Sequence, residues 1–462
     1  MFNGSVDYDL LIVGSGSAAF AAGIEARALG ASVALVERAM LGGTCVNVGC
    51  VPSKALLAAA ARAAQAREHR FAGVTTSVEP IDLAALIAEK NELVGTLRQA
   101  KYADLAALHG IEILYGEARF VDEQALKVAG RTVTARHLLI ATGAEPAVPD
   151  LPGLDAIDSL TSTSAMELDE LPDRLVVVGA GFVGVEQAQL FAHLGTAVAL
   201  IGPLVPHAEP ELAGGLDAVL RAEGIARCGS KAVRIDTNTN GVKVICGDGT
   251  AATGDQVLIA TGRRPRTADL ALDRAGVEVD DDGHVKIDAN QRTSNPNIWA
   301  AGDVATGPQF VYVAATSAKI AARNALTGSA KTVDYTGLPH VLFTSPQLAW
   351  SGLTEAEARS SGRGVDTRTL SLHQVPRAIA SRDTRGAIKL VADAHTHQLL
   401  GVHVLAEHGG ELLLAATIAI KAGWTVEQLA ETWAPYLTMN EGLKLAAQSF
   451  SSNVTELSCC AS

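Results

Sequence analysis

The chain has 462 residues, 48% of them hydrophobic, which is enough for about three domains with substantial cores. Its formal net charge is −13 and it contains no basic tract, which argues against a nucleic-acid partner. It shows neither an uninterrupted apolar run of the ~18 residues that span a membrane nor a basic, signal-like N-terminus. We therefore expect a cytoplasmic protein without membrane insertion.

The first elements predict a dinucleotide-binding unit. Buried strands are expected at 8–13 and 33–36, joined by an alanine-rich helix that ends near residue 29. The turn before the helix follows the pattern G-x-G-x-x-A, which lets the backbone approach a pyrophosphate at the helix N-terminus. An acidic residue about 20 positions later can accept hydrogen bonds from a ribose. The residues expected to bind the dinucleotide are Gly14, Gly16, Ala18, Ala19 and Glu37.

A glycine-rich stretch at 42–54 holds two cysteines, Cys45 and Cys50, followed by Lys54. A regular helix would turn the two thiols about 140° apart, so they can face each other only if the backbone departs from a regular helix. Gly49 permits that departure, and Pro52 lacks an amide hydrogen. On spacing alone the pair could be a redox dithiol, a structural pair or half of a zinc site. No second Cys/His pair at ligand spacing completes such a zinc site.

The first pattern recurs further along the chain. Long helices are expected over 55–69 and 81–109, and then a strand leads into Ala141-Thr142-Gly143. After a turn-rich junction at 149–153, a strand at 175–178 precedes a second set of glycines and a helix to about residue 194. A later strand leads into Ala260-Thr261-Gly262. The second set of glycines is Gly179, Gly181 and Gly184. This duplicated order predicts two dinucleotide sites, one for a flavin and one for a nicotinamide.

The two copies differ at the position of the ribose acid. Gly202 stands in the second copy where Glu37 stands in the first. A carboxylate there would favour NADH by repelling the 2′-phosphate of NADPH. Its absence favours NADPH, although we see no nearby arginine to complete that preference.

The remaining segments carry three further features. A strand at 297–303 ends in Asp303, which could bind a hydroxylated ligand or cap the helix expected at 314–326. Strands and helices alternate from about residue 335, which predicts an α+β domain. Cys228 and Cys246 lie in strand-like segments, where we expect core or surface roles without chemistry. Cys459 and Cys460 form a terminal pair that is either coincidental or a soft ligand set for a thiophilic metal.

Taken together, the two glycine motifs, the stretch 42–54 and the segment Ala301-Gly302-Asp303 resemble the flavin-dependent pyridine nucleotide–disulfide oxidoreductases. The resemblance covers essentially the whole chain and implies FAD and NADPH as cofactors, with NADH less favoured. It implies an α/β fold with two Rossmann-like domains and a C-terminal α+β dimerisation domain. The expected limits are 1–150 and 271–335 for FAD, 151–270 for NAD(P)H, and 336–462 for the interface domain with its metal-binding tail. Beyond the first motif, the implied cofactor contacts are Gly43, Thr44, Lys54, Thr142, Gly143, Gly179, Gly181, Gly184, Gly262 and Asp303.

Two features resemble the branch of this family that reduces Hg(II). Disulfide-reducing relatives carry a catalytic histidine near the C-terminus, and Tyr436 stands at that position here. A dithiol substrate needs such a base, whereas a metal held by thiolates does not. The second feature is the Cys459–Cys460 tail. The mercury-carrying N-terminal domain of many members is expected to be absent, because the first glycine motif begins almost at once.

The resemblance also implies roles for individual residues. Cys50 would lie against the flavin and Cys45 would exchange ligands, while Lys54 would pair with Glu186 beside the flavin. Tyr436 would assist transfer of Hg(II) from the tail, within a homodimer whose active site both subunits share. The implied metal ligands are Cys45, Cys50, Cys459 and Cys460. Two rivals remain, namely a dihydrolipoamide- or glutathione-type disulfide reductase and a non-catalytic flavoprotein that binds a metal or a partner.

Overall fold

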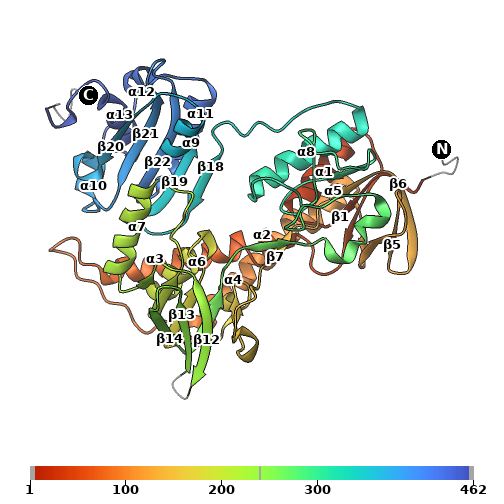
Figure 1. Cartoon of the computed structure of the whole chain (residues 1–462), viewed down its shortest axis with the longest axis horizontal. Coiled ribbons are helices and arrows are strands. Elements are labelled where there is room, and N and C mark those ends of the chain that lie inside the picture. The colour runs from red at the N-terminus through yellow and green to blue at the C-terminus, as the bar shows by residue number, and fades with distance from the viewer. Residues whose placement is uncertain (1–5, 239–240, 457–462) are drawn as a thin grey trace.

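The buried runs near the N-terminus form a largely parallel sheet, as their apolar sequences predict. In the computed structural model, which describes residues 6–238 and 241–456, the strands follow the order β3-β2-β1-β6-β5-β4, and β17 also pairs with β6. Helices α1 and α8 lie side by side against this sheet (Figure 1). The elements are β1 (Tyr8–Val13), α1 (Ser17–Ala28), β2 (Val33–Glu37), β3 (Glu112–Tyr115), β4 (Ala118–Phe120), β5 (Ala125–Val128), β6 (Arg131–Ile140), β17 (Ile298–Ala300) and α8 (Val311–Thr327).

The predicted long helices are present, with one change at their start. Helix α2 (Gly43–Asn47) is followed by α3 (Cys50–Arg67). Helix α4 (Leu83–Arg98) continues through a π turn (Gln99–Ala103) into α5 (Asp104–His109). Helix α3 begins at Cys50, so Pro52 lies in its first turn. Proline is tolerated there, because the amide hydrogen that it lacks would have no partner within the helix. The expectation that Pro52 helps to break the helix is wrong, since the break falls at Val48 and Gly49.

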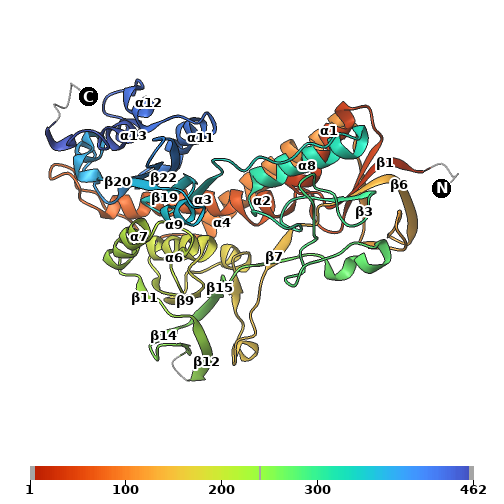
Figure 2. The ribbon, with the colours of Figure 1, turned by 45° about the horizontal axis from the view of Figure 1, so that its top comes forward.

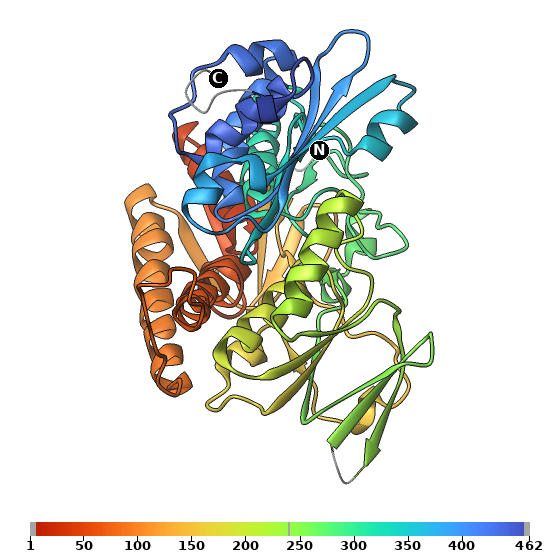
Figure 3. The ribbon, with the colours of Figure 1, turned by 90° about the vertical axis from the view of Figure 1, so that its left-hand side faces the viewer.

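The second glycine motif lies in a five-stranded parallel sheet of order β11-β10-β9-β15-β8. A three-stranded antiparallel sheet, β12-β13-β14, packs beside it and projects at the lower edge of the molecule (Figure 3). The elements are β8 (Leu160–Thr161), β9 (Arg174–Val178), α6 (Phe182–Leu194), β10 (Ala197–Ile201), α7 (Pro210–Ala222), β11 (Ala226–Cys228), β12 (Ala232–Asn238), β13 (Gly241–Cys246), β14 (Ala251–Gly254) and β15 (Gln256–Ile259).

The same kind of backbone contact occurs within each of the two parallel units. Gly14 has φ +114° and Gly179 has φ +106°, conformations that favour glycine. A Cβ on Gly14 would lie 2.3 Å from the carbonyl oxygen of Ala141, and one on Gly179 would lie 2.2 Å from that of Ala260. Each glycine motif therefore packs against the Ala-Thr-Gly segment of its own unit. This contact explains why the two sequence patterns recur together.

A short antiparallel ribbon of β7 (Ala144–Pro146) and β16 (Arg263–Pro265) connects the two parallel units. It runs between them in Figures 1 and 2. The C-terminal unit is an antiparallel sheet of order β18-β19-β22-β21-β20, with helices packed against it. The sequence did not reveal β19 or β20. The elements are β18 (Pro339–Leu342), β19 (Gln347–Gly352), α9 (Glu355–Ser360), β20 (Val365–Ser371), β21 (Ala387–Asp393), β22 (Leu399–Ala406), α11 (Leu413–Lys421), α12 (Val426–Glu431) and α13 (Met439–Gln448).

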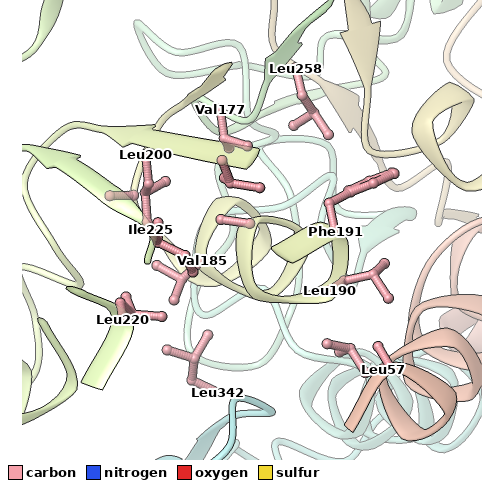
Figure 4. Packing of buried hydrophobic residues seen from close by; sticks show 14 of the residues in the cluster. Leu57, Val177, Val185, Leu190, Phe191, Leu200, Leu220, Ile225, Leu258 and Leu342 are labelled. Carbon is pink, nitrogen blue, oxygen red and sulfur yellow. The ribbon is translucent and has the colours of Figure 1, made fainter. Parts of the chain in front are cut away.

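One hydrophobic core joins all three units around α6. Figure 4 shows Val185, Leu190 and Phe191 of α6 at its centre, with Leu57 of α3 and Leu342 of β18 on its flanks. All five side chains are at most 8% exposed. Because close-packed interiors resist displacement, this core holds α3, α6 and the end of β18 in fixed relation.

The helical stretch 43–67 meets the length and hydropathy of a membrane span, with a mean hydropathy of 1.3 over its most apolar window. The expectation from sequence concerned uninterrupted apolar runs, and charged residues at 54 and 62 interrupt this stretch. Alanine-rich core helices pass the same test, and Leu56, Leu57 and Ala60 of this stretch are buried in the core shared with α6.

Candidate active site

Cys45 and Cys50 lie on opposite sides of the break between α2 and α3. Cys45 belongs to α2 and Cys50 is the first residue of α3, with Gly49 at φ −125° and ψ −109° between them. Both cysteines are free thiols and each is the other's hydrogen-bond partner. The break therefore brings together two side chains that a continuous helix would hold apart.

The two thiols differ in proton affinity. The hydrogen bond from Cys45 lowers the pKa of Cys50 to about 7, with burial opposing this shift and the charge of Lys54 supporting it. The pKa of Cys45 is raised, first because its thiol donates that hydrogen bond and then because it is partly buried. The pair therefore loses its first proton near neutral pH and holds the second, and Cys50 carries the thiolate.

Lys54 forms the expected ion pair with Glu186. Its Nζ lies 2.7 Å from Glu186 Oε2, and the Glu186 side chain is only 8% exposed. The other carboxylate oxygen of Glu186 accepts a hydrogen bond of 3.0 Å from the backbone amide of Phe343. The centroid of the Phe343 ring lies 4.6 Å from Lys54 Nζ. Residues of α3, α6 and the segment after β18 therefore meet next to Cys50. Phe343 was missed by sequence reasoning, because nothing in its local pattern signals a contact with the other units.

The first glycine motif lies directly against the cysteine stretch. Gly43 has φ +64°, and a Cβ there would lie 2.6 Å from the Cα of Gly16. The amide of Gly42 donates to Ser15 Oγ at 3.1 Å, and Ser15 also bonds Glu37. Glu37, buried at the end of β2, also accepts a 2.6 Å hydrogen bond from the amide of Ala39.

This cradle fits a dinucleotide. Open backbone without side chains lies at the N-terminus of α1, where Ala18 and Ala19 are buried behind it. Thr44 follows Gly43 in α2, so a dinucleotide on α1 would extend toward the cysteines. Ser15 was also missed as a site residue, because the pattern G-x-G-x-x-A specifies no residue type at its position.

Asp303 lies beyond the end of β17 and does not cap the next helix. Helix α8 begins at Val311, after Phe310, so the capping alternative for Asp303 is wrong. Burial raises the pKa of Asp303, while the charges of Arg263 and His284 oppose that shift. Nearby, the Thr142 hydroxyl donates to the carbonyl oxygen of Arg266 at 2.8 Å, and the carbonyl of Gly143 accepts from the Arg266 amide at 2.9 Å.

The second motif has the same tight geometry as the first. Gly181 precedes α6, and a Cβ on Gly184 would lie 1.8 Å from the carbonyl oxygen of Gly179. Gly262 has φ +125° and its carbonyl accepts from the amide of Ala147 at 3.0 Å. These glycines leave open backbone at the N-terminus of α6, as a second dinucleotide requires.

An arginine does lie near Gly202, contrary to the expectation from sequence. Arg227 of β11 donates to the carbonyl of Gly202 at 3.1 Å and to that of Leu200 at 2.5 Å, and its Nε lies 2.8 Å from Asp217. Its side chain is only 2% exposed. The guanidinium is thus committed to the protein interior. Its sequence separation of 25 residues from Gly202 hid this contact.

Tyr436 and the cysteine pair of the same chain are not brought together. Tyr436 is 49% exposed and lies between α12 and α13. Both helices belong to the C-terminal unit, and Figures 1 and 2 show them on the side of that unit away from α2. Trp433 in the same segment is 96% exposed. Cys459 and Cys460 lie outside the described residues.

Comparison with known proteins gives matches along nearly the whole chain. A family model described as pyridine nucleotide-disulphide oxidoreductase matches residues 8–318, and the model of the corresponding dimerisation domain matches residues 338–447. A protein named mercuric reductase from Streptomyces lividans is 52% identical over 483 residues, covering 100% of both chains. Another from Bacillus cereus is 48% identical, covering 99% of this chain and 74% of the relative.

Solved structures give the same relationship. The Cu(II) complex of the HOCl-induced flavoprotein disulfide reductase RclA from Escherichia coli matches with a TM-score of 0.86 at 30% identity. That match covers 97% of this chain and 100% of the other. The predicted α/β fold class is confirmed by the sheets described above. The chain therefore belongs to the pyridine nucleotide-disulphide oxidoreductase family.

Proposed function

We propose that this protein reduces Hg(II) to Hg(0) with electrons from NADPH. Its family indicates an FAD-dependent oxidoreductase that uses a pyridine nucleotide. Relatives named mercuric reductase span identities from 39% to 52% over nearly the full length of this chain. The observation that carries the proposal is the facing pair Cys45 and Cys50, with a thiolate on Cys50 near neutral pH.

Hg(II) is a soft cation that prefers thiolate ligands, so the paired sulfurs suit it as a substrate. Cys50 offers its thiolate first, and the metal displaces the proton of Cys45 as the second sulfur binds. Lys54 places a positive charge next to Cys50 and supports its thiolate form, whereas the charge of Glu186, its ion-pair partner, opposes that form. FAD, when bound, supplies the relay by which an electron pair passes from NADPH to the site of the metal. One NADPH and one Hg(II) thus give NADP⁺, a proton and Hg(0).

NADPH is favoured by Gly202, which puts no carboxylate at the end of β10 to repel a 2′-phosphate. Arg227 is held by Asp217 and backbone carbonyls, so it does not supply the positive partner for that phosphate. The preference rests on the missing acid alone. Such a reductase fits a cytoplasmic location, where NADPH is available and thiols stay reduced.

Metal delivery is proposed to use both subunits of a homodimer. Cys459 and Cys460 would take Hg(II) from its thiol complexes and pass it to Cys45 and Cys50 by ligand exchange. Tyr436 would assist that transfer in the site of the partner subunit. The match to a dimerisation domain and the separation of Tyr436 from Cys45 within one chain support this arrangement.

The test is mercury-dependent NADPH oxidation by the purified, flavin-loaded protein, with Hg(II) held by excess small thiol and release of Hg(0) measured. Cys45→Ser should lower turnover by roughly three orders of magnitude or more, as the loss of a reacting group does. Ser77→Ala, at an exposed position outside this site, is the control, and its turnover should be unchanged. NADH should support a lower kcat/KM than NADPH. Truncation before Cys459 should raise the KM for bulky Hg(II)–thiol complexes.

The other outcomes discriminate the rival functions. Turnover that survives Cys45→Ser would exclude the dithiol mechanism. Turnover with oxidised lipoamide or glutathione, but not with Hg(II), would identify a disulfide reductase. A flavin-loaded protein that turns over no acceptor would be a binding protein rather than an enzyme.

A further inference from the structure

The structure brings Cys228 and Cys246 together with Asp248, although 18 residues separate the two cysteines in sequence. Their two Sγ atoms and a carboxylate oxygen of Asp248 all lie within 4.8 Å of one another. Both cysteines are free thiols. The earlier expectation treated them as separate residues without chemistry, and the tertiary structure changes that interpretation.

Strand pairing explains the meeting. Cys228 is the last residue of β11, and the chain then turns into β12, whose first residue, Ala232, pairs with Cys246 at the end of β13. The turn after β13 closes back on this connection, because the amide of Gly247 donates to the carbonyl of Lys231 at 2.9 Å. Asp248 lies in that same turn. The three side chains therefore gather where the parallel sheet and the antiparallel sheet meet.

We propose that Cys228, Cys246 and Asp248 form a second binding site for a thiophilic divalent cation, separate from Cys45 and Cys50. Thiolates are the ligands that soft cations prefer, and a carboxylate completes a mixed set. With metal–sulfur bonds of ~2.3 Å, two sulfurs stand about 3.8 Å apart in a tetrahedral site and about 4.6 Å apart in a linear one. The observed limit of 4.8 Å accommodates either geometry with small side-chain adjustments.

The surroundings suit a site that opens on one side. Cys246 is 1% exposed within an apolar cluster, Cys228 is partly buried, and Asp248 is exposed. Cys228 Sγ lies 4.0 Å from both carboxylate oxygens of Asp248. The hydroxyl of Thr250 lies 3.2 Å from Cys228 Sγ and 2.6 Å from Asp248 Oδ1, and so orients both ligands. A cation would enter past Asp248, and each thiol would release its proton as its metal–sulfur bond forms.

A second cluster of possible metal ligands among the described residues consists of three glutamates, and it is already occupied by a lysine. Glu209, Glu211 and Glu355 surround the ammonium group of Lys389, with each contact at 2.9 Å. That cation already neutralises the group. The hydrogen-bond partners of the Cys228 thiol, by contrast, are Ser230, Asp248 and Thr250, none of which is a cation.

The experiment uses the full chain with Cys45, Cys50, Cys459 and Cys460 replaced by serine, so that it does not depend on turnover. Cd(II) is the probe, and thiolate-to-cadmium charge-transfer absorption reports binding. We expect one Cd(II) per chain. Cys228→Ser or Cys246→Ala in this background should weaken binding by more than the 10–100-fold typical of an outer-shell partner. Asp248→Asn should weaken it several-fold, whereas Asp281→Asn, an exposed aspartate outside the cluster, should leave it unchanged.

A second measurement guards against misfolding, because Cys246 lies in a packed core. Bound Cd(II) should raise the unfolding temperature of the four-serine protein and not that of its Cys228→Ser derivative. Absence of stoichiometric Cd(II), or binding that survives both cysteine substitutions, would overturn the proposal. A Cys228–Cys246 disulfide that forms in the presence of Cd(II) and leaves no metal bound would also overturn it. The wild-type reductase assay is unaffected by either result, so failure here and failure of the proposed function are distinguishable.

Discussion

The thiol of Cys50 is the more acidic of the pair because of where each neighbouring group lies. It receives a hydrogen bond from Cys45, it begins α3, and it lies within the field of Lys54. A helix N-terminus and a nearby cation both stabilise an anion. Partial desolvation of the thiol opposes these effects, although the residue is exposed overall, and the pKa still falls to about 7. Hence a larger share of Cys50 thiols is ionised at neutral pH than of ordinary thiols, whose pKa is about 8.5.

Lys54→Met should raise the pKa of Cys50, because the substitution removes a positive charge that favours the thiolate. Alkylation of Cys50 in the reduced protein, followed by mass spectrometry across pH, should show a midpoint near 7 in the wild type and a higher midpoint in the variant. Arg62→Met, at an exposed position further along α3, serves as the control and should leave the midpoint in place. An unchanged midpoint in Lys54→Met would contradict the assigned role of this charge.

At the scale of elements, a buried cation fastens the C-terminal sheet to the second parallel unit. Lys389 of β21 is 2% exposed at its side chain and contacts Glu209, Glu211 and Glu355. The first two lie at the start of α7 and the third begins α9. Glu209 is equally buried, so its carboxylate depends on Lys389 for compensation.

Lys389→Met should lower the free energy of unfolding by ~3–5 kcal/mol, because it leaves a buried carboxylate without its cation. Urea unfolding followed by tryptophan fluorescence measures the change. Lys421→Met provides the matched comparison, since Lys421 pairs with Asp334 at the surface, where the two side chains are 45% and 58% exposed. Loss of that pair should cost at most about 1 kcal/mol. Equal effects of the two substitutions would show that burial does not strengthen the Lys389 contacts.

At the scale of the whole molecule, the C-terminal unit exposes several large apolar side chains to solvent. Trp433 is 96% exposed, Leu414 71% and Ile418 54%. Exposed apolar surface of this kind marks an interaction site, and residues 338–447 match a dimerisation domain. Tyr436 follows the exposed Trp433 by three positions, and the helices on either side of it lie away from α2, which carries Cys45. A second copy would account for both features.

A mixing experiment tests whether the site is shared between subunits. Cys45→Ser and Tyr436→Phe homodimers should each be impaired. If Tyr436 acts in the partner's site, subunit exchange builds one intact site per mixed dimer from the two unmutated residues. Activity should therefore recover to about half that of the wild type per mixed dimer, measured as mercury-dependent NADPH oxidation. Mixtures that recover nothing, despite subunit exchange verified by differential tags, would place Tyr436 in the site of its own chain.

Local sequence was sufficient for features that depend on nearest neighbours along the chain. Hydrophobic periodicity located the strands and helices of both parallel units, and glycine spacing located both cradles, because these patterns reflect backbone geometry within a few residues. The sequence also marked Cys45 and Cys50 as residues that can face each other only if the helix breaks near Gly49, and the break lies at Val48 and Gly49. Element ends were less secure, as the early start of α3 shows, because a first-turn proline is tolerated there.

Contacts between distant segments were decided only by the tertiary structure. The amide of Phe343 reaches Glu186 across 157 residues, and Lys389 reaches Glu209 across 180. Cys228 meets Cys246 only because β12 and β13 pair in one register. Local sequence preferences do not predict such partners, because their proximity follows from how whole elements pack. The sequence therefore determined the two nucleotide cradles and the dithiol, whereas packing decided which charges and thiols surround them.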